Sequence, residues 1–172
     1  MSNVYVASDT VIGKNVTIES GARIGVRGLA LERYGENSEK FRMKKYLGKV
    51  VLHDKVHIGA NTCVERGLTG DTIIGEGSKI DLLCCIGHDV VIGKNCRITP
   101  LCNILGYAQI GNNVFIGGST AVRNRIRIGD NAWIGMGSLI VKDVEPLTFI
   151  FGHPPNMTAR KIEPRSSSND NE

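Results

Sequence analysis

Residues 74–140 read "IGEGSKIDLLCCIGHDVVIGKNCRITPLCNILGYAQIGNNVFIGGSTAVRNRIRIGDNAWIGMGSLI", and this stretch decides the fold. An aliphatic residue, Ile or Val, stands at every sixth position without a slip: 74, 80, 86, 92, 98, 104, 110, 116, 122, 128, 134 and 140. A helix would show a period of 3.6 residues and an ordinary strand strict alternation, and a sustained period of six fits neither. The period predicts an all-β chain of short strands, the hexapeptide parallel β-helix.

Each six-residue unit has a second inward position. Four residues after each aliphatic comes an uncharged residue: Ser78, Cys84, Val90, Cys96, Cys102, Ala108, Val114, Thr120, Ile126, Ala132, Ser138 and Val144. Many of the aliphatic residues are followed directly by glycine, as in Gly75 and Gly93, and we expect this glycine to relieve a strained turn. Three units make one triangular coil, so residues 18 apart stack at about 4.8 Å. Each buried Ile or Val contributes about 1.5–3 kcal/mol before conformational entropy is subtracted.

Two interruptions break the register on the N-terminal side. The aliphatic positions also occur at 12, 18 and 24 and again at 52, 58 and 64, and the segment "VERGLTGDTI" (64–73) carries four extra residues. Residues 27–49 have lost the pattern and hold seven basic and three acidic residues, so we expect a protruding loop. Such a loop is either a solvated excursion or a lid or anion clamp. We expect one domain over residues 1–163, with this loop and a short C-terminal cap, and a disordered polar tail over 164–172.

Composition narrows the class of protein. The 172 residues carry a formal charge of +4, which favours anionic ligands, and no basic run interleaved with aromatics indicates a nucleic-acid partner. We see no signal peptide and no stretch of 18 apolar residues, and we expect no membrane insertion. Five cysteines without paired spacing are typical of a reducing cytoplasm. Cys84, Cys96 and Cys102 fall on inward positions, so we interpret them as core residues and not metal ligands.

A histidine stands inside the repeat, in "IGHDVVIG" (86–93). His88 occupies the third position of its unit, next to a turn, so its side chain is expected to point outward. Gly106 follows 18 residues later and should stack on it, offering a backbone N–H with no side chain in front. An imidazole beside an unobstructed amide is the minimal equipment for acyl transfer, because one takes a proton from the nucleophile and the other stabilises the oxyanion.

Several segments resemble a known family: "GARIG" (21–25), "GKVVLHDKVHIGANTCVERG" (48–67), "DTIIGEGSKID" (71–81), "IGHDVVIG" (86–93) and "VFIGGSTAV" (114–122). They are similar to the left-handed β-helix acyltransferases, above all the UDP-3-O-(3-hydroxyacyl)glucosamine N-acyltransferases and the N-acetyltransferases of nucleotide-linked amino sugars. The resemblance implies that His88 is the catalytic base, that Asp81 orients it, and that the Gly106 amide forms the oxyanion hole. It also implies a homotrimer with active sites in the clefts between neighbouring prisms.

The acyl donor is expected toward the C-terminal coils, where basic residues gather. Arg123, Arg125, Lys142 and Arg160 could bind the phosphates of coenzyme A or the acidic face of an acyl carrier protein; the alternative is an ordinary exposed edge. A second site histidine of the family would fall near Arg125, and the family's Asp-Arg-Gly is Glu-Arg-Gly (65–67) here. These departures favour the shorter relatives that acetylate deoxysugars.

The sequence thus predicts an N-acyltransferase that moves an acetyl or acyl group from acetyl- or acyl-coenzyme A to a nucleotide-linked amino sugar, with His88 as general base and no metal. The first alternative is a lipid A type UDP-3-O-acylglucosamine N-acyltransferase supplied by an acyl carrier protein. More remote alternatives are a zinc carbonic anhydrase using His53, His57 and His88, and a non-catalytic scaffold.

Overall fold

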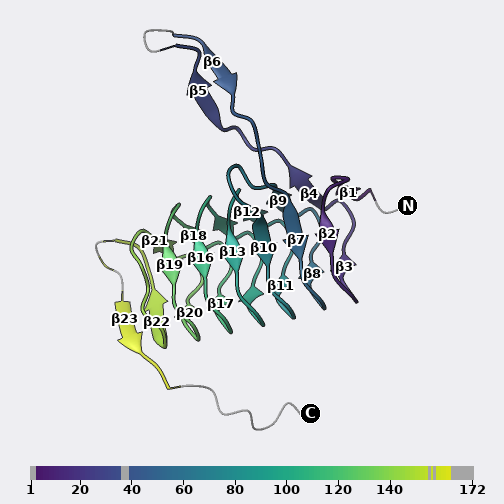
Figure 1. Cartoon of the computed structure of the whole chain (residues 1–172). Helices are drawn as coiled ribbons and strands as arrows, with labels where there is room; N and C mark the ends of the chain where they lie inside the picture. The colour runs from purple at the N-terminus through teal and green to yellow at the C-terminus, as the bar shows by residue number, and fades with distance from the viewer. Residues whose placement is uncertain (1–2, 36–38, 155, 157, 164–172) are drawn as a thin grey trace.

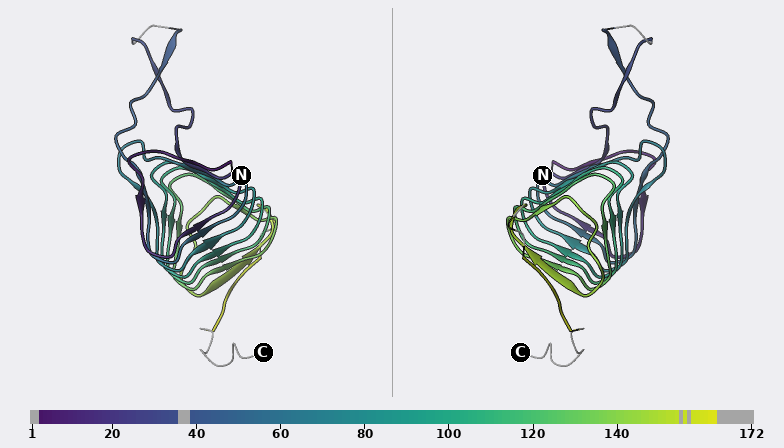
Figure 2. Two further views of the ribbon diagram at one scale, coloured as in Figure 1. Left: turned by 90° about the vertical axis from the view of Figure 1, so that its right-hand side faces the viewer. Right: turned by 90° about the vertical axis from the view of Figure 1, so that its left-hand side faces the viewer.

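The chain winds into a stack of flat triangular coils. The computed structural model describes residues 3–35, 39–154, 156 and 158–163, and the tail 164–172 lies outside them. Within these residues the regular structure is all strand. Figure 1 shows the strands stacked side by side, and Figure 2, which looks along the stack, shows the triangular outline. The predicted all-β hexapeptide β-helix is confirmed.

Three sheets form the faces of this prism. Sheet A consists of β1 (Tyr5–Val6), β4 (Arg23–Val26), β9 (Cys63–Glu65), β12 (Cys85–Ile86), β15 (Asn103–Ile104), β18 (Ala121–Val122) and β21 (Leu139–Ile140). Sheet B consists of β2 (Val11–Ile12), β7 (Val50–Leu52), β10 (Thr72–Ile74), β13 (Val91–Ile92), β16 (Gln109–Ile110) and β19 (Arg127–Ile128). Sheet C consists of β3 (Thr17–Ile18), β8 (His57–Ile58), β11 (Lys79–Ile80), β14 (Arg97–Ile98), β17 (Phe115–Ile116), β20 (Trp133–Ile134), β22 (Thr148–Phe151) and β23 (Thr158–Lys161).

The register between coils follows the six-residue period. Ile86 lies opposite Ile104, and Ile92 lies opposite Ile110, each 18 residues further along. Every aliphatic position from Ile74 to Ile140 is at most 3% exposed, and the second inward positions from Ser78 to Val144 are at most 4% exposed. The core therefore fills the prism axis, as the sequence predicts, because each unit contributes one large and one small side chain to it.

The glycine after the aliphatic residue has a different role from the expected one. A Cβ on Gly75 would lie 2.4 Å from the carbonyl oxygen of Gly93 in the next coil, so glycine is needed because the two backbones touch there. The left-handed backbone instead falls two residues later, for example at Asn95 with φ 54° and Asn113 with φ 56°. Asparagine tolerates this conformation better than most residues. The expectation that glycine relieves the turn is wrong.

Buried polar side chains form hydrogen bonds with backbone N–H and carbonyl groups at the corners of the coils. The Ser78 hydroxyl donates to the Gly93 carbonyl at 2.7 Å and accepts from the Cys96 N–H at 2.9 Å. The Cys96 thiol contacts the Gly111 carbonyl oxygen at 3.0 Å. Cys84, Cys96 and Cys102 are all buried, which confirms them as core residues.

Both interruptions leave the prism at one edge. The turns that lead from a sheet A strand to a sheet B strand form what we call the A–B edge. Between β4 and β7, the described residues of the segment 27–49 include β5 (Leu31–Arg33) and β6 (Phe41–Met43), which pair antiparallel and are seen at the top of Figure 1. The four extra residues lie between β9 and β10, so Val64 pairs with Ile86, 22 residues away. The sequence thus departs from regularity twice, at the edge that also carries His88.

The C-terminal end is closed by β22 and the antiparallel β23. Ile150, 7% exposed, continues the inward aliphatic positions over the last coil. No helix among the described residues is long and apolar enough to cross a membrane.

Candidate active site

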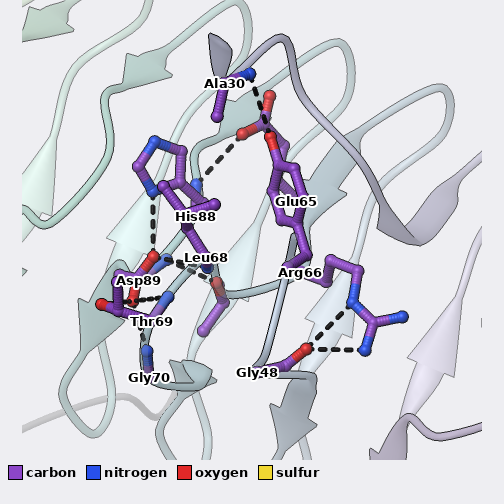
Figure 3. A network of polar contacts seen from close by, with 11 residues as sticks. Ala30, Gly48, Glu65, Arg66, Leu68, Thr69, Gly70, His88 and Asp89 are labelled. Carbon is purple, nitrogen blue, oxygen red and sulfur yellow. Dashed lines mark hydrogen bonds and ion pairs between the residues drawn. The ribbon is translucent and has the colours of Figure 1, made fainter. Parts of the chain in front are cut away.

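His88 lies on the A–B edge, between β12 and β13. Its side chain is 22% exposed, and its Nδ1 lies 2.9 Å from Oδ2 of Asp89 (Figure 3). Because an ionised carboxylate only accepts hydrogen bonds, Nδ1 carries the proton and Nε2 keeps a free lone pair. The geometry therefore sets the tautomer in which Nε2 can act as a base.

Asp89 is held by the backbone of the four-residue insertion. The Leu68 N–H donates to Oδ2 at 2.6 Å, while the N–H groups of Thr69 and Gly70 donate to Oδ1 at 2.9 and 2.6 Å. The Thr69 hydroxyl adds a further bond to Oδ1 at 2.7 Å. Figure 3 shows these donors converging on the Asp89 carboxylate below the imidazole. The extra residues in "VERGLTGDTI" thus build the support for the His88–Asp89 pair.

The same donors fix the charge of Asp89. Burial by itself would raise the pKa of Asp89, but the hydrogen bonds from Gly70, Thr69, His88 and Leu68 outweigh it and lower the pKa to about 2. Hydrogen bonds to the charged form have this effect in general. Asp89 therefore stays an anion at neutral pH and keeps the imidazole oriented.

Gly106 lies directly against the imidazole, as predicted. A Cβ on Gly106 would come within 2.7 Å of Cε1 and 2.8 Å of Nε2 of His88. The Tyr107 N–H donates to the His88 carbonyl at 2.9 Å, which locks the two turns together. Among the hydrogen bonds of the described residues, none uses the Gly106 N–H. The ring and an amide donor therefore sit side by side with no side chain between them.

Residues that the sequence did not single out complete the surroundings. Tyr107 and Tyr46 meet the His88 ring edge-on, with ring centroids 5.0 and 6.4 Å away. The Tyr46 hydroxyl accepts the Ala30 N–H at 3.3 Å, so the base of the hairpin is fixed beside His88. Glu65 Oε2 accepts the His88 N–H at 3.2 Å. Tyr107 and Glu65 could have been found from their register with His88, whereas nothing in the irregular segment 27–49 marks Tyr46.

Asp81, which the resemblance pairs with His88, lies on a different edge of the prism in this chain. It follows β11 and leads to β12, so it lies on the edge between sheets C and A. Its carboxylate accepts the N–H of the neighbouring Leu82 at 2.7 Å. A six-residue step moves a position from one face of the prism to the next, and Asp81 is therefore on another edge from His88. Within one chain Asp81 therefore lies away from His88, and Asp89 is the carboxylate that contacts the imidazole.

The predicted donor-binding residues are only partly brought together. Arg123 and Arg125 follow β18 and Lys142 follows β21, so these three lie on the A–B edge on the C-terminal side of His88. The Arg125 guanidinium lies over the Tyr107 ring, 4.7 Å from its centroid. Arg160 lies in β23, opposite Phe149 in sheet C. Arg160 is thus on another face of the same chain.

The histidines of the carbonic anhydrase alternative are spread over the prism. His53 follows β7 on the edge between sheets B and C, and His57 lies in β8 with its Nε2 3.8 Å from Glu19 Oε1. In the described part of the chain, no cluster of three or more His, Cys, Asp and Glu side chains is arranged to hold a metal ion.

Comparison with known proteins supports the hexapeptide-repeat fold. Residues 107–142 match the family described as the hexapeptide repeat of succinyl-transferase. The chain is a left-handed hexapeptide-repeat β-helix, similar to acyltransferases. The match covers the coils that include Tyr107 and the basic residues Arg123, Arg125 and Lys142.

Curated relatives and solved structures both carry acyltransferase names. UDP-3-O-acylglucosamine N-acyltransferase of Sinorhizobium fredii is 48% identical over 80 residues, which are 46% of this chain and 22% of that protein. The protein of the same name from Agrobacterium fabrum is 42% identical over 79 residues, covering 46% of this chain and 21% of its own length. UDP-N-acetylglucosamine O-acyltransferase of Moraxella catarrhalis superposes with a TM-score of 0.80 at 29% identity, over 94% of this chain and 59% of that one. The chain thus spans about a fifth of the curated relatives and about three fifths of that structure.

Proposed function

We propose that this protein transfers an acyl group from a thioester to the amino group of a nucleotide-linked amino sugar. The observation that carries the proposal is the His88 imidazole, fixed by Asp89 through Nδ1 and packed against Gly106. The names of the curated relatives favour an acceptor of the UDP-3-O-acylglucosamine type. We therefore prefer the lipid A type acceptor to the acetylated deoxysugar that the sequence alone favours.

The arrangement suits a base-assisted addition. Nε2 of His88 takes the proton from the neutral amine as its nitrogen forms a bond to the thioester carbonyl carbon. The oxyanion that develops accepts a hydrogen bond from the Gly106 N–H, a contact worth about 10²–10³-fold in rate. When the carbon–sulfur bond breaks, the imidazolium returns the proton to the departing thiolate. Asp89 stays ionised throughout and stabilises the imidazolium.

The donor would approach from the C-terminal side of His88. Arg123, Arg125 and Lys142 line the A–B edge there, and coils about 4.8 Å apart place them two to three coils beyond His88. This row of cations suits the phosphates of coenzyme A or the acidic surface of an acyl carrier protein. Arg160 could join it only from a neighbouring copy in the proposed homotrimer, because it lies on sheet C of its own chain.

A second candidate is O-acylation of a nucleotide sugar. The structural match to UDP-N-acetylglucosamine O-acyltransferase covers nearly the whole chain. A histidine base serves a hydroxyl nucleophile as well as an amine, so the geometry of His88 and Gly106 fits both reactions. The acceptor alone distinguishes them.

Release of free thiol from defined donors tests the proposal. Purified protein is incubated with one of three donors: acetyl-coenzyme A, 3-hydroxyacyl-coenzyme A or 3-hydroxyacyl carrier protein. Each donor is combined with UDP-3-O-acylglucosamine or with UDP-N-acetylglucosamine as acceptor. The products are identified by mass spectrometry. We expect an amide product from UDP-3-O-acylglucosamine and a loss of about 10²–10⁴-fold in rate for His88→Ala. His53→Ala, an exposed histidine on another edge, is the matched control. An ester product alone would establish the second candidate, and turnover that survives His88→Ala would refute both.

A further inference from the structure

A concave region that is rich in arginine opens on the N-terminal side of His88. It has a volume of about 710 Å³, in the range of small-molecule sites. The charged residues that line it are Arg23, Arg27 and Arg66. The remaining lining includes the ring of Tyr5, which is 49% exposed. Basic side chains and an open aromatic face are thus combined in one hollow.

Two of the arginines are held in place by backbone carbonyls. Arg66 donates from Nε and Nη2 to the Gly48 carbonyl at 2.9 and 2.7 Å, and from Nη2 to Asp9 at 2.5 Å. Arg23 donates from Nη1 to the Asn3 carbonyl at 2.6 Å. The hydrogen bonds of the described residues leave Nη1 of Arg66 and Nε and Nη2 of Arg23 without an acceptor. Fixed guanidinium groups with spare donors are suited to bind a phosphate.

The third arginine connects the hollow to the proposed active site. Arg27 is exposed and begins the segment that returns through Tyr46. Tyr46 in turn meets the His88 ring. Val64 pairs with Ile86, so Arg66 is in register with His88 and lies one coil before it on the same edge.

We infer that this hollow binds the nucleoside diphosphate of the acceptor, with Arg27 and Arg66 on the phosphates and the base stacked on Tyr5. The inference rests on the proposed function, because the sugar must lie between the diphosphate and His88. A sugar whose nucleophile faces Nε2 of His88 would extend its diphosphate along the A–B edge toward Arg66. The edge would then hold the acceptor on the N-terminal side of His88 and the donor on the C-terminal side.

Binding of uridine diphosphate, measured by titration calorimetry without any acyl donor, tests the inference. We expect binding to the wild type, binding at least about 10-fold weaker for Arg27→Ala because a charge-assisted contact is lost, and unchanged binding for His88→Ala. Lys14→Ala removes one exposed positive charge from another edge at the same end of the prism and should leave the affinity unchanged. Uridine and inorganic pyrophosphate are titrated alongside, and Tyr5→Ala should abolish the preference for uridine diphosphate over pyrophosphate.

The outcomes separate this inference from the proposed function. If Arg27→Ala and Lys14→Ala bind uridine diphosphate equally, or if the wild type does not bind it, the arginine hollow is not the nucleotide site, whatever the turnover. If binding depends on Arg27 but no donor is consumed with any acceptor, the nucleotide site stands and the acyl-transfer proposal fails. In an active protein, Arg27→Ala should raise the acceptor KM and leave kcat unchanged.

Discussion

Replacing Asp89 by Asn should damage both the activity and the stability of the protein. The Asn carbonyl would take the Oδ1 position, where Thr69 and Gly70 supply three hydrogen-bond donors. Its NH₂ group would then face the Leu68 N–H and Nδ1 of His88. A donor opposite Nδ1 makes that nitrogen the acceptor, so the proton moves to Nε2 and the base is lost.

The magnitudes follow from these contacts. Loss of general-base action lowers kcat by about 10²–10⁴-fold. A buried N–H left without an acceptor at Leu68 costs about 1–3 kcal/mol, which for a chain of this length lowers Tm by about 2–4 °C per kcal/mol. The acceptor KM should change little, because Asp89 is 6% exposed and lies behind the imidazole.

Thiol release and ¹⁵N NMR of the imidazole are the assays for Asp89→Asn. The NMR spectrum should show the proton on Nδ1 in the wild type and on Nε2 in the variant. Asp81→Asn is the matched control, since the Asp81 carboxylate is exposed and contacts only the adjacent Leu82 N–H among the hydrogen bonds of the described residues. Wild-type kcat in Asp89→Asn, or an equal loss in Asp81→Asn, would refute the assignment of Asp89 as the orienting acid.

Three further predictions concern neighbouring features. Gly106→Ala should lower kcat by about 10²-fold or more, because the new Cβ would displace the His88 ring; Gly118→Ala, where the nearest atom is 3.2 Å away, is the control, and equal activity of the two would contradict the packing. In acid, the stability that Asp89 contributes should be lost as the pH falls from about 4 toward its pKa of about 2. Chemical denaturation at a series of pH values should show the free energy of unfolding falling more steeply in this range for the wild type than for Asp89→Asn. Parallel curves for the two proteins would refute this prediction. Ser78→Ala should cost about 1–3 kcal/mol by urea unfolding, because the Cys96 N–H loses its acceptor; a loss below 0.5 kcal/mol, roughly the effect of a surface change, would count against this role.

The sequence predicts most of the fold because each coil repeats the same local requirement. The positions from Ile74 to Val144 fix which side chains enter the core, and the break at "VERGLTGDTI" marks where a turn must be longer. The pairing of His88 with Gly106 also follows from the spacing of 18. The period does not determine the conformation of the irregular segment 27–49, and so the contact of Tyr46 with His88 could not be predicted. The resemblance pairs Asp81 with His88, but in this chain Asp81 lies on the edge between sheets C and A. Asp89 contacts His88 instead, and its carboxylate is held by the backbone donors of the insertion, whose conformation the period does not determine.

Because the coils stack at a constant spacing, the distance between two sites on the A–B edge is set by the number of coils between them. Each added or removed set of 18 residues would shift everything beyond it by one step of about 4.8 Å without changing any corner or strand. Deleting residues 108–125 should therefore carry Lys142 one step nearer to His88 while leaving the His88–Asp89 pair intact. A protein built this way can match the length of a long substrate by altering its number of coils. The distance between the donor-binding residues and His88 can therefore change in evolution while the His88–Asp89 pair stays the same.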